Sequence, residues 1–403
     1  MTSLMEKSKK EKFERKQKRK EKIIKIIKIG GSICFVLGVI IFVYFQMNRT
    51  FNSYVVIDKV ERKDSLTAQY ITYEGNILKY SRDGATAISP RGEIIWNGSY
   101  DMKNPYAVTC GSYVAIADIG GKEVYVYNGT DSGTRMELDY PIEEVAVAKQ
   151  GVVALVLKKG KESEINIYDP YNAAEQLKVS ISTSTDADGF PVSIALSKDG
   201  KKLVTSYLNV KNAVLQNSIN FYNFGEIGKN SVDRIVGSRA LDEEIAVDIE
   251  FLTETTVCVY TQEGFKLYRM KETPQDIKEI KVEDNIKSLI GNEDYIAMVL
   301  ENDGEIENPY RLEVYDLSGE RVLEKDISFS YEQIAIDESD IVFFSGKECN
   351  IIRINGTEKL NCEFDTGIAY FFGIKNSDKY IVIDEENIHL VRLSTKDKGG
   401  DES

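Results

Sequence analysis

The five residues Leu312 to Asp316, LEVYD, decide the fold because their pattern of apolar, any, apolar, aromatic, Asn or Asp recurs along the chain. Close copies are VYVYN (Val124–Asn128), INIYD (Ile165–Asp169) and INFYN (Ile219–Asn223), and looser copies are ATAIS (85–89), FKLYR (265–269), IIRIN (351–355) and IHLVR (388–392). Period-two alternation indicates a β-strand, and the final Asn or Asp indicates a turn. Eight such strands indicate that the chain is built from a repeat.

Each copy follows a more apolar strand, such as Val152 to Val156 or Tyr295 to Leu300, and most of these follow a further short strand, such as Val145 to Ala148. Four strands repeating every roughly 35 to 55 residues are typical of a propeller blade, which buries its faces against neighbouring blades. Two β-sandwiches are the alternative architecture, but the strands of a sandwich do not come in regularly repeated groups of four. We therefore predict an all-β chain with a β-propeller of eight blades, seven being the alternative.

The last unit, Ile368 to Leu393, supplies three strands before the polar end of the chain. The strand-like segment Tyr54 to Val60 precedes the first complete unit and belongs to no blade there. We expect it to complete the last blade and close the ring, because closure removes exposed sheet edges. The predicted propeller domain is 54–396, followed by a disordered tail at 397–403.

The segment Ile29 to Phe45 is apolar and uncharged, and with the uncharged residues to Asn48 it approaches the ~20 residues of a membrane helix. A cleaved signal peptide is the alternative. The run is longer than the ~7 to 15 residues of a signal-peptide core, and no small-residue cleavage site follows it. We predict one uncleaved signal-anchor helix at 29–48 and a linker at 49–53.

Charge is divided unequally across this segment. Residues 1–28 hold twelve Lys and Arg against four Glu, and Arg49 adds one positive charge, so the remainder is near −23 in a chain of net charge −14. Positive charge flanking a membrane helix marks the cytoplasmic side. We expect a single-pass cell-membrane protein whose basic tail contacts membrane lipid and whose acidic domain is extracytoplasmic. An acidic exterior also argues against nucleic acid as a partner.

Several stretches resemble known propellers. Gly75 to Asn97 is similar to quinoprotein-like repeats, and SKDGKKL (Ser197 to Leu203) is similar to the turn of WD40-like and TolB-like repeats. The whole chain resembles an uncharacterised family of bacterial single-pass membrane proteins with an extracytoplasmic propeller. ILKYSRDGA, MKNPYAV, FYNFGEIGKNSVDRIVG and YRLEVYDLSGERVL carry this resemblance. It implies no activity, because the family is a domain of unknown function.

The sequence offers little for catalysis. His389 is the only histidine, expected on the solvent side of a strand, Trp96 is the only tryptophan, and no Cys-x-x-Cys cluster occurs. Zinc and imidazole-based catalysis therefore lack their usual ligands and bases. We predict no catalytic residue, metal or cofactor. A pair of carboxylates acting on a glycan is the one catalytic route left open.

The fourth unit is irregular, with the connections Leu208 to Ser218 and Phe224 to Glu244. Long loops on a rigid scaffold often bind partners. These loops carry Lys229, Arg234 and Arg239 in an acidic domain, which suits an acidic or glycan partner; alternatively, they only connect strands. We expect a non-catalytic module or scaffold that binds a protein or glycan at the bacterial cell envelope. The alternative is a carboxylate-dependent enzyme acting on envelope polysaccharide.

Cys349 and Cys362 are candidates for a disulfide. If Asn355 and Gly356 form a two-residue type I′ turn, Cys349 faces Cys362, Ile351 faces Leu360, and Arg353 faces Glu358. Facing residues of the closer kind of antiparallel pair have Cα atoms ~4.5 Å apart, within the range of a disulfide.

Overall fold

The chain divides after Thr50 into two units. The computed structural model describes residues 28, 35–39, 41–42, 44–45, 48–64, 67–130, 133–172, 175–185, 187–211, 213–241, 244–375 and 377–395. In the first unit, residues 35–39, 41–42 and 44–45 are helical. Within the described ranges no helix is both long and apolar enough to span a bilayer. Half of the predicted anchor at 29–48, residues 1–27 of the basic tail and the predicted tail at 397–403 lie outside these ranges.

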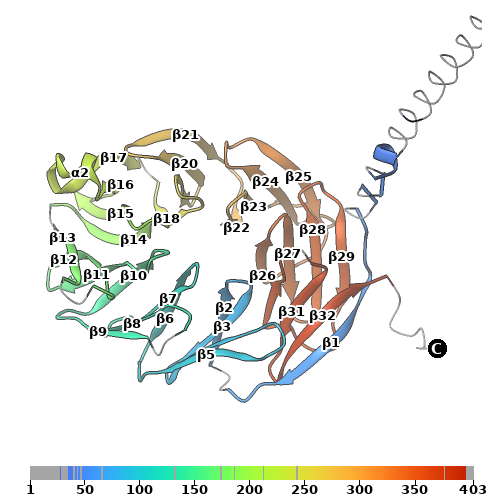
Figure 1. Ribbon diagram of the computed structural model, residues 1–403. Helices are drawn as coiled ribbons and strands as arrows, with labels where there is room; N and C mark the ends of the chain where they lie inside the picture. The colour runs from blue at the N-terminus through green and yellow to red at the C-terminus, as the bar shows by residue number, and fades with distance from the viewer. Residues whose placement is uncertain are drawn as a thin grey trace, which may run out of the picture. The chain divides into compact units, whose positions relative to one another are not determined.

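The second unit is a β-propeller, as the repeat predicts. Its described strands form eight antiparallel sheets of four strands, arranged as blades around an axis (Figure 1). In blades 1 to 7 the strands follow chain order from the innermost to the outermost. The predicted blade count of eight is therefore confirmed.

The first four blades comprise sixteen strands in chain order. They are β2 (Gln69–Tyr73), β3 (Asn76–Ser81), β4 (Gly84–Ile88) and β5 (Ile94–Ser99); β6 (Pro105–Cys110), β7 (Tyr113–Asp118), β8 (Glu123–Tyr127) and β9 (Thr134–Glu137); β10 (Ile142–Val147), β11 (Val153–Lys159), β12 (Glu162–Tyr168) and β13 (Leu177–Ser184); and β14 (Phe190–Leu196), β15 (Lys202–Lys211), β16 (Val214–Asn223) and β17 (Ile235–Leu241). Two short helices, α2 (Glu226–Lys229) and η1 (Val232–Arg234), connect β16 to β17.

The remaining blades complete the ring. They contain β18 (Ala246–Phe251), β19 (Thr256–Thr261), β20 (Gly264–Met270) and β21 (Pro274–Lys281); β22 (Ile286–Gly291), β23 (Tyr295–Glu301), β24 (Tyr310–Asp316) and β25 (Arg321–Ile327); β26 (Gln333–Asp337), β27 (Asp340–Ser345), β28 (Glu348–Arg353) and β29 (Glu358–Glu363); and β30 (Tyr370–Gly373), β31 (Lys379–Ile383), β32 (Asn387–Ser394) and β1 (Ser53–Glu61).

The N-terminal strand β1 closes the ring, which confirms the prediction for Tyr54 to Val60. It pairs antiparallel with β32 from Ser53 opposite Ser394 to Glu61 opposite Asn387. In Figure 1 the blue β1 lies beside the red β32, so the last blade joins the two ends of the domain. Closure leaves no inner or second strand unpaired in the described ring.

The hydrophobic core is distributed between adjacent blades. The second strands are buried on both faces: in β19 every residue from Thr256 to Thr261 is buried. One cluster joins Val124 and Val126 of blade 2 to Val153 and Leu155 of blade 3. Each sheet thus buries its faces on its neighbours, which is why the second strand of each unit reads as a continuous apolar run.

Candidate binding surfaces

The fourth blade carries a two-stranded extension. β15 and β16 pair in unbroken register from Lys202 opposite Asn223 to Lys211 opposite Val214. The neighbouring strands stop earlier, because β14 reaches only Leu208 and β17 reaches only Asn217. Residues 209–216, which we call the hairpin arm, therefore continue beyond the blade. The expectation of a loop at Leu208 to Ser218 is wrong, because this segment is a regular hairpin.

The hairpin arm is apolar and exposed. Val210 retains 65% of its accessible surface, Val214 retains 60% and Leu215 retains 43%. Val210 lies opposite Leu215, so the two form an apolar cross-strand pair on one face of the arm. Val214 is the next residue along and points to the other face, because side chains alternate along a strand.

The predicted cationic site lies elsewhere on the blade. Lys229 ends α2 and forms an ion pair with Glu226, and Arg239 on β17 forms one with Asp276 through Nε and Oδ1 at 3.0 Å. Arg234 ends η1 and has a positive φ of 62°. Two of the three predicted cations thus already have an acidic neighbour in this chain.

The arm and the helical connection occupy opposite ends of the blade. The arm turns at the start of β16, whereas α2 follows the end of that ten-residue strand, so they are separated by ~30 Å at the rise of a β-strand. The structure therefore does not unite the two predicted loops in one surface. The second segment, Phe224 to Glu244, is only partly a loop, because Ile235–Leu241 forms the outer strand β17.

Carboxylates gather on the inner strands of blades 3 and 5. The hydroxyl of Ser193 on β14 donates to Asp248 Oδ1 at 3.0 Å. Partial burial, the charge of Asp248 and the charge of Glu143 together raise the pKa of Glu144 to about 7. Sequence analysis did not find this cluster. Its only local signal is acidic residues within apolar inner strands, IEEVAV and AVDIEF.

These carboxylates line cavities around the axis. Asp248 and Glu250 line a cavity of about 550 Å³, whereas Glu144 lines another of about 570 Å³ with Glu143 and Lys158. The Tyr260 hydroxyl donates to Glu250 Oε2 at 3.1 Å. Burial raises the pKa of Glu250, and the hydrogen bond from Tyr260 opposes this shift. The inner strands therefore present carboxylates to these cavities, and that of Glu144 has a pKa of about 7.

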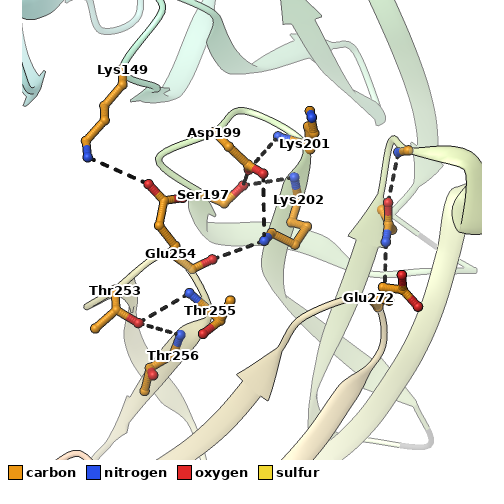
Figure 2. Close-up of polar contacts among 12 residues, drawn as sticks. Lys149, Ser197, Asp199, Lys201, Lys202, Thr253, Glu254, Thr255, Thr256 and Glu272 are labelled. Carbon is orange, nitrogen blue, oxygen red and sulfur yellow. Dashed lines mark hydrogen bonds and ion pairs between the residues drawn. The ribbon is translucent and has the colours of Figure 1, made fainter.

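The turns at the end of the blades opposite the arm are cross-linked by polar contacts (Figure 2). Lys202, which is 6% exposed, donates from Nζ to the backbone oxygen of Glu254 at 3.0 Å. Lys149 Nζ lies 3.7 Å from Glu254 Oε1, so blades 3, 4 and 5 are joined. A Lys198–Glu293 ion pair links blade 4 to blade 6. Several charged side chains at this end of the blades therefore form ion pairs or hydrogen bonds with other parts of the propeller.

The turn at Ser197 is organised by its own side chains. Ser197 Oγ donates to Asp199 Oδ1 at 2.6 Å and accepts the backbone N–H of Lys202 at 3.0 Å. Burial would raise the pKa of Asp199, but hydrogen bonds from Ser197 and the Lys201 N–H outweigh it and lower that pKa. The SKDGKK segment that resembles propeller repeats is thus a structural turn.

Cys349 and Cys362 face each other across β28 and β29, as predicted. The turn beside them differs from the prediction. The N–H of Gly356 donates to the Arg353 oxygen and the N–H of Arg353 to the Thr357 oxygen, giving a three-residue turn in which Gly356 has φ +83°. Arg353 therefore does not face Glu358, which is opposite Ile352. The disulfide itself stays a prediction.

A compensating bulge explains why the cysteine register is still correct. The register shifts by one residue between Ile351 and Ile352, which restores the predicted pairing of Ile351 with Leu360. The third and fourth strands of other blades shift at the same point, for example at Val314/Tyr315 in blade 6. Such a bulge follows a type I turn ended by a left-handed glycine.

His389 serves a structural contact. It lies on β32, is half-buried, and its Nε2 is 2.8 Å from Asp384 Oδ2. Asp384 also accepts the backbone N–H groups of Glu386 and Asn387. The expectation of a solvent-facing histidine is wrong, because the Asp384 turn folds over this side of the strand. Among the described residues no group of three or more His, Cys, Asp or Glu side chains could hold a metal ion.

A sequence profile, the Family of unknown function (DUF5711), matches residues 47–393. The chain belongs to this family. No curated protein matches the sequence. The match spans the propeller from β1 to its last strand β32, so the family shares the whole ring.

Solved structures with the same architecture include BamB from Moraxella catarrhalis, at 10% identity and a TM-score of 0.51 over 85% of this chain and 100% of that chain. A eukaryotic initiation factor matches at 13% identity and a TM-score of 0.53 over 84% of each chain. Porphyromonas gingivalis dipeptidyl peptidase 4 matches at 13% identity and a TM-score of 0.55 over 79% of this chain and 56% of that chain. At such identities the likeness concerns the fold alone.

Proposed function

We propose that this propeller is a non-catalytic scaffold that binds a protein partner through its hairpin arm. The observation that carries the proposal is the exposure of Val210, Val214 and Leu215 on a segment whose two strands pair in unbroken register. Burying each of these side chains on a partner contributes about 1.5–3 kcal/mol. The arm is already ordered, so binding costs little conformational entropy.

An apolar arm fits a protein better than a glycan. Glycan sites combine planar aromatic surfaces with many polar donors, whereas the arm offers aliphatic side chains. Aliphatic side chains such as Val210 add apolar contact area but form no hydrogen bonds with the hydroxyl groups of a glycan. Lys229 and Arg234 at the other end of the blade, with Arg239 on the outer strand β17, remain a secondary candidate site, for an acidic partner.

We place the scaffold at the bacterial cell envelope, held by a single membrane helix at 29–48 with its N-terminus in the cytoplasm. The basic residues 1–28 and the acidic remainder support this orientation. The described helical residues support a lipid environment, because Phe35, Phe42 and Phe45 are each at least 64% exposed. Side chains of this kind are stable when lipid covers them.

Site-specific photo-crosslinking in the producing cells tests the arm. A photoreactive phenylalanine analogue replaces Val214 in the full chain, and the same analogue replaces Val322, an exposed residue of the outer strand β25. The expected result is a discrete adduct of one protein from position 214 and none from position 322. The adduct should disappear when Val210 and Leu215 are both changed to Ser.

The cationic group provides the matched control. Changing Lys229, Arg234 and Arg239 to Glu should leave the Val214 adduct unchanged, because Lys229 and Arg234 lie at the opposite end of the blade and Arg239 lies on the outer strand β17, opposite Ile219 and outside the arm. Loss of the adduct in this triple variant, with the Val210 and Leu215 variant unaffected, would move the site to the helical connection. No adduct from position 214 would overturn the proposal.

The inner carboxylates favour one second candidate, a carboxylate-dependent enzyme acting on envelope polysaccharide. A glycosidase acts through a pair of acids, and Glu144 has a pKa raised to about 7 by burial and by the charges of Asp248 and Glu143. In this scheme Glu144 donates a proton and Asp248 acts as base or nucleophile. Release of reducing sugar from envelope polysaccharide by the purified chain, lost in both Glu144→Gln and Asp248→Asn, would establish it.

A further inference from the structure

A cavity of about 310 Å³ lies between blades 1 and 2, far from the fourth-blade arm. It is bounded by the start of β2, the turn between β3 and β4, and the connection from β5 to β6. Its lining residues are Thr67, Gln69, Tyr80, Ser81, Arg82, Lys103, Asn104 and Pro105. Two cations, Arg82 and Lys103, therefore reach one cavity from two separate connections.

This cavity differs in charge from the others. None of its lining residues is acidic, although the chain from residue 50 onward has a net charge near −23. Four other cavities in the described part of the propeller each include at least one carboxylate, and the one between blades 7 and 8 includes Glu332, Asp365, Asp384, Glu385 and Glu386. The lining of the blade 1–2 cavity is thus positively charged, whereas the domain as a whole is negatively charged.

Neither cation is neutralised within the part of the chain that the structure describes. Among the described residues, no side chain forms an ion pair or hydrogen bond with the Arg82 guanidinium or the Lys103 ammonium group. Basic side chains on the strands do have acidic partners, such as Lys158 on β11 with Glu143 at 3.1 Å and Arg311 on β24 with Asp284. Two uncompensated cations in one cavity are available to an external anion.

The neutral residues of the cavity add hydrogen-bond donors. The Tyr80 hydroxyl donates to Gln69 Oε1 at 2.6 Å, which leaves the Gln69 amide nitrogen to donate elsewhere. Ser81 Oγ accepts the Asp83 N–H at 3.4 Å, which leaves its own proton to donate. Asp118 Oδ1 accepts the Asn104 N–H at 2.7 Å, but Asp118 does not line the cavity.

From this arrangement we infer that the blade 1–2 cavity binds the phosphate group of a small organic phosphate. A planar guanidinium matches two oxygens of a tetrahedral oxyanion, and an ammonium group adds a point charge. The cavity volume is at the lower end for small-molecule sites.

Calorimetric titration of the purified full-length chain with glycerol 3-phosphate tests the inference. The expected result is saturable binding that weakens as salt is added. Arg82→Gln and Lys103→Gln should each weaken it about tenfold, since each removes a charged hydrogen-bond donor. Both residues are exposed, so the two variants should melt at the parent temperature.

Lys347→Gln is the matched control, because Lys347 lines the acidic cavity between blades 7 and 8. It should bind glycerol 3-phosphate as the parent does. Titration with glucuronate separates phosphate from carboxylate recognition and should give much weaker binding. No saturable binding at millimolar concentration, an equal loss in Lys347→Gln, or glucuronate binding as tight as that of glycerol 3-phosphate would each overturn the assignment. None of these outcomes depends on the hairpin arm.

Discussion

Tyr54 and Asp365 are joined by two hydrogen bonds although 311 positions separate them in the sequence. The Tyr54 hydroxyl donates to Asp365 Oδ2 at 3.1 Å and accepts the Asp365 N–H at 3.0 Å. The Tyr54 ring also stacks on Phe364, with centroids 4.1 Å apart. The closing strand is thus fixed by side chains to blade 7 as well as by its backbone to β32.

Tyr54→Ala should therefore destabilise the propeller by about 3 kcal/mol, as expected for loss of a buried aromatic side chain. Tyr54→Phe keeps the stacking and should cost only about 1 kcal/mol, through the lost hydrogen bonds. Urea unfolding of both variants measures the difference. Equal stability of Tyr54→Ala and the parent would show that this contact does not hold the ring closed.

Removing Tyr54 to Val60 altogether should expose the edge of β32 and cause aggregation. Removing Lys396 to Ser403 should change neither the melting temperature nor the solubility, since no described strand includes these residues. Size-exclusion chromatography with thermal melting distinguishes the two deletions. A soluble propeller with the parent melting temperature after the first deletion would contradict closure by β1.

Cys349 and Cys362 should form a disulfide when the folded protein is treated with a mild thiol oxidant, because they already face each other. Burial raises the pKa of the Cys349 thiol, so the reaction should be slow at neutral pH and faster in alkali. For a loop of about this length the bond should stabilise the fold by about 3 kcal/mol. Peptide mapping without reductant detects it, with the buried Cys258 as the unreacted control.

Glu144→Gln should flatten the dependence of stability on pH. The pKa of this carboxyl group is raised to about 7 by burial, Asp248 and Glu143. The protonated group therefore adds to the free energy of unfolding fully below about pH 4.5, and this stabilisation is lost as pH rises through 7. The parent should lose on the order of 1–2 kcal/mol more than Glu144→Gln between pH 5 and pH 8. Urea unfolding at both pH values tests this. Glu305→Gln, at an exposed loop residue, should behave as the parent; identical pH profiles for Glu144→Gln and the parent would refute the assignment.

Protease added to intact cells stripped of their wall should digest the propeller and leave residues 1–28 protected. The basic flank and the apolar segment at 29–48 predict this orientation. An antibody epitope placed after Ser403 should disappear on treatment, whereas one placed before Met1 should survive. Survival of the C-terminal epitope would show that the predicted topology is wrong.

The repeat was sufficient to predict the ring, because each blade must present the same alternation to its neighbours. In blade 7 the predicted copy of the repeat, IIRIN, begins two residues too late. The bulge in the third strand of blade 7 aligns with the bulge in blade 6 when Cys349–Arg353 is matched to LEVYD. The turn residues show the correct register. Arg353 to Gly356 corresponds to Asp316 to Gly319, and each closes with a hydrogen bond from glycine to the first residue.

The surfaces were harder to predict than the ring. Asn209, Asn212 and Asn217 are residues that favour turns. For this reason the sequence predicted a loop at Leu208 to Ser218, where β15 and β16 continue as the hairpin arm. The inner carboxylates come together from strands about a hundred positions apart, and the blade 1–2 cavity combines connections that share no motif. Such convergence depends on the curvature of the whole ring, which local sequence patterns do not encode.

The position of β1 has a mechanical consequence. A pulling force that enters the domain at Phe51 runs along β1, whose ladder to β32 extends from Ser53 to Glu61. The hydrogen bonds of an antiparallel pair are perpendicular to the strands, so this load shears them all together and does not open them one at a time. The strand that closes the ring is therefore also the strand through which tension on the N-terminus enters the propeller, and its ladder to β32 transmits that load to the last blade.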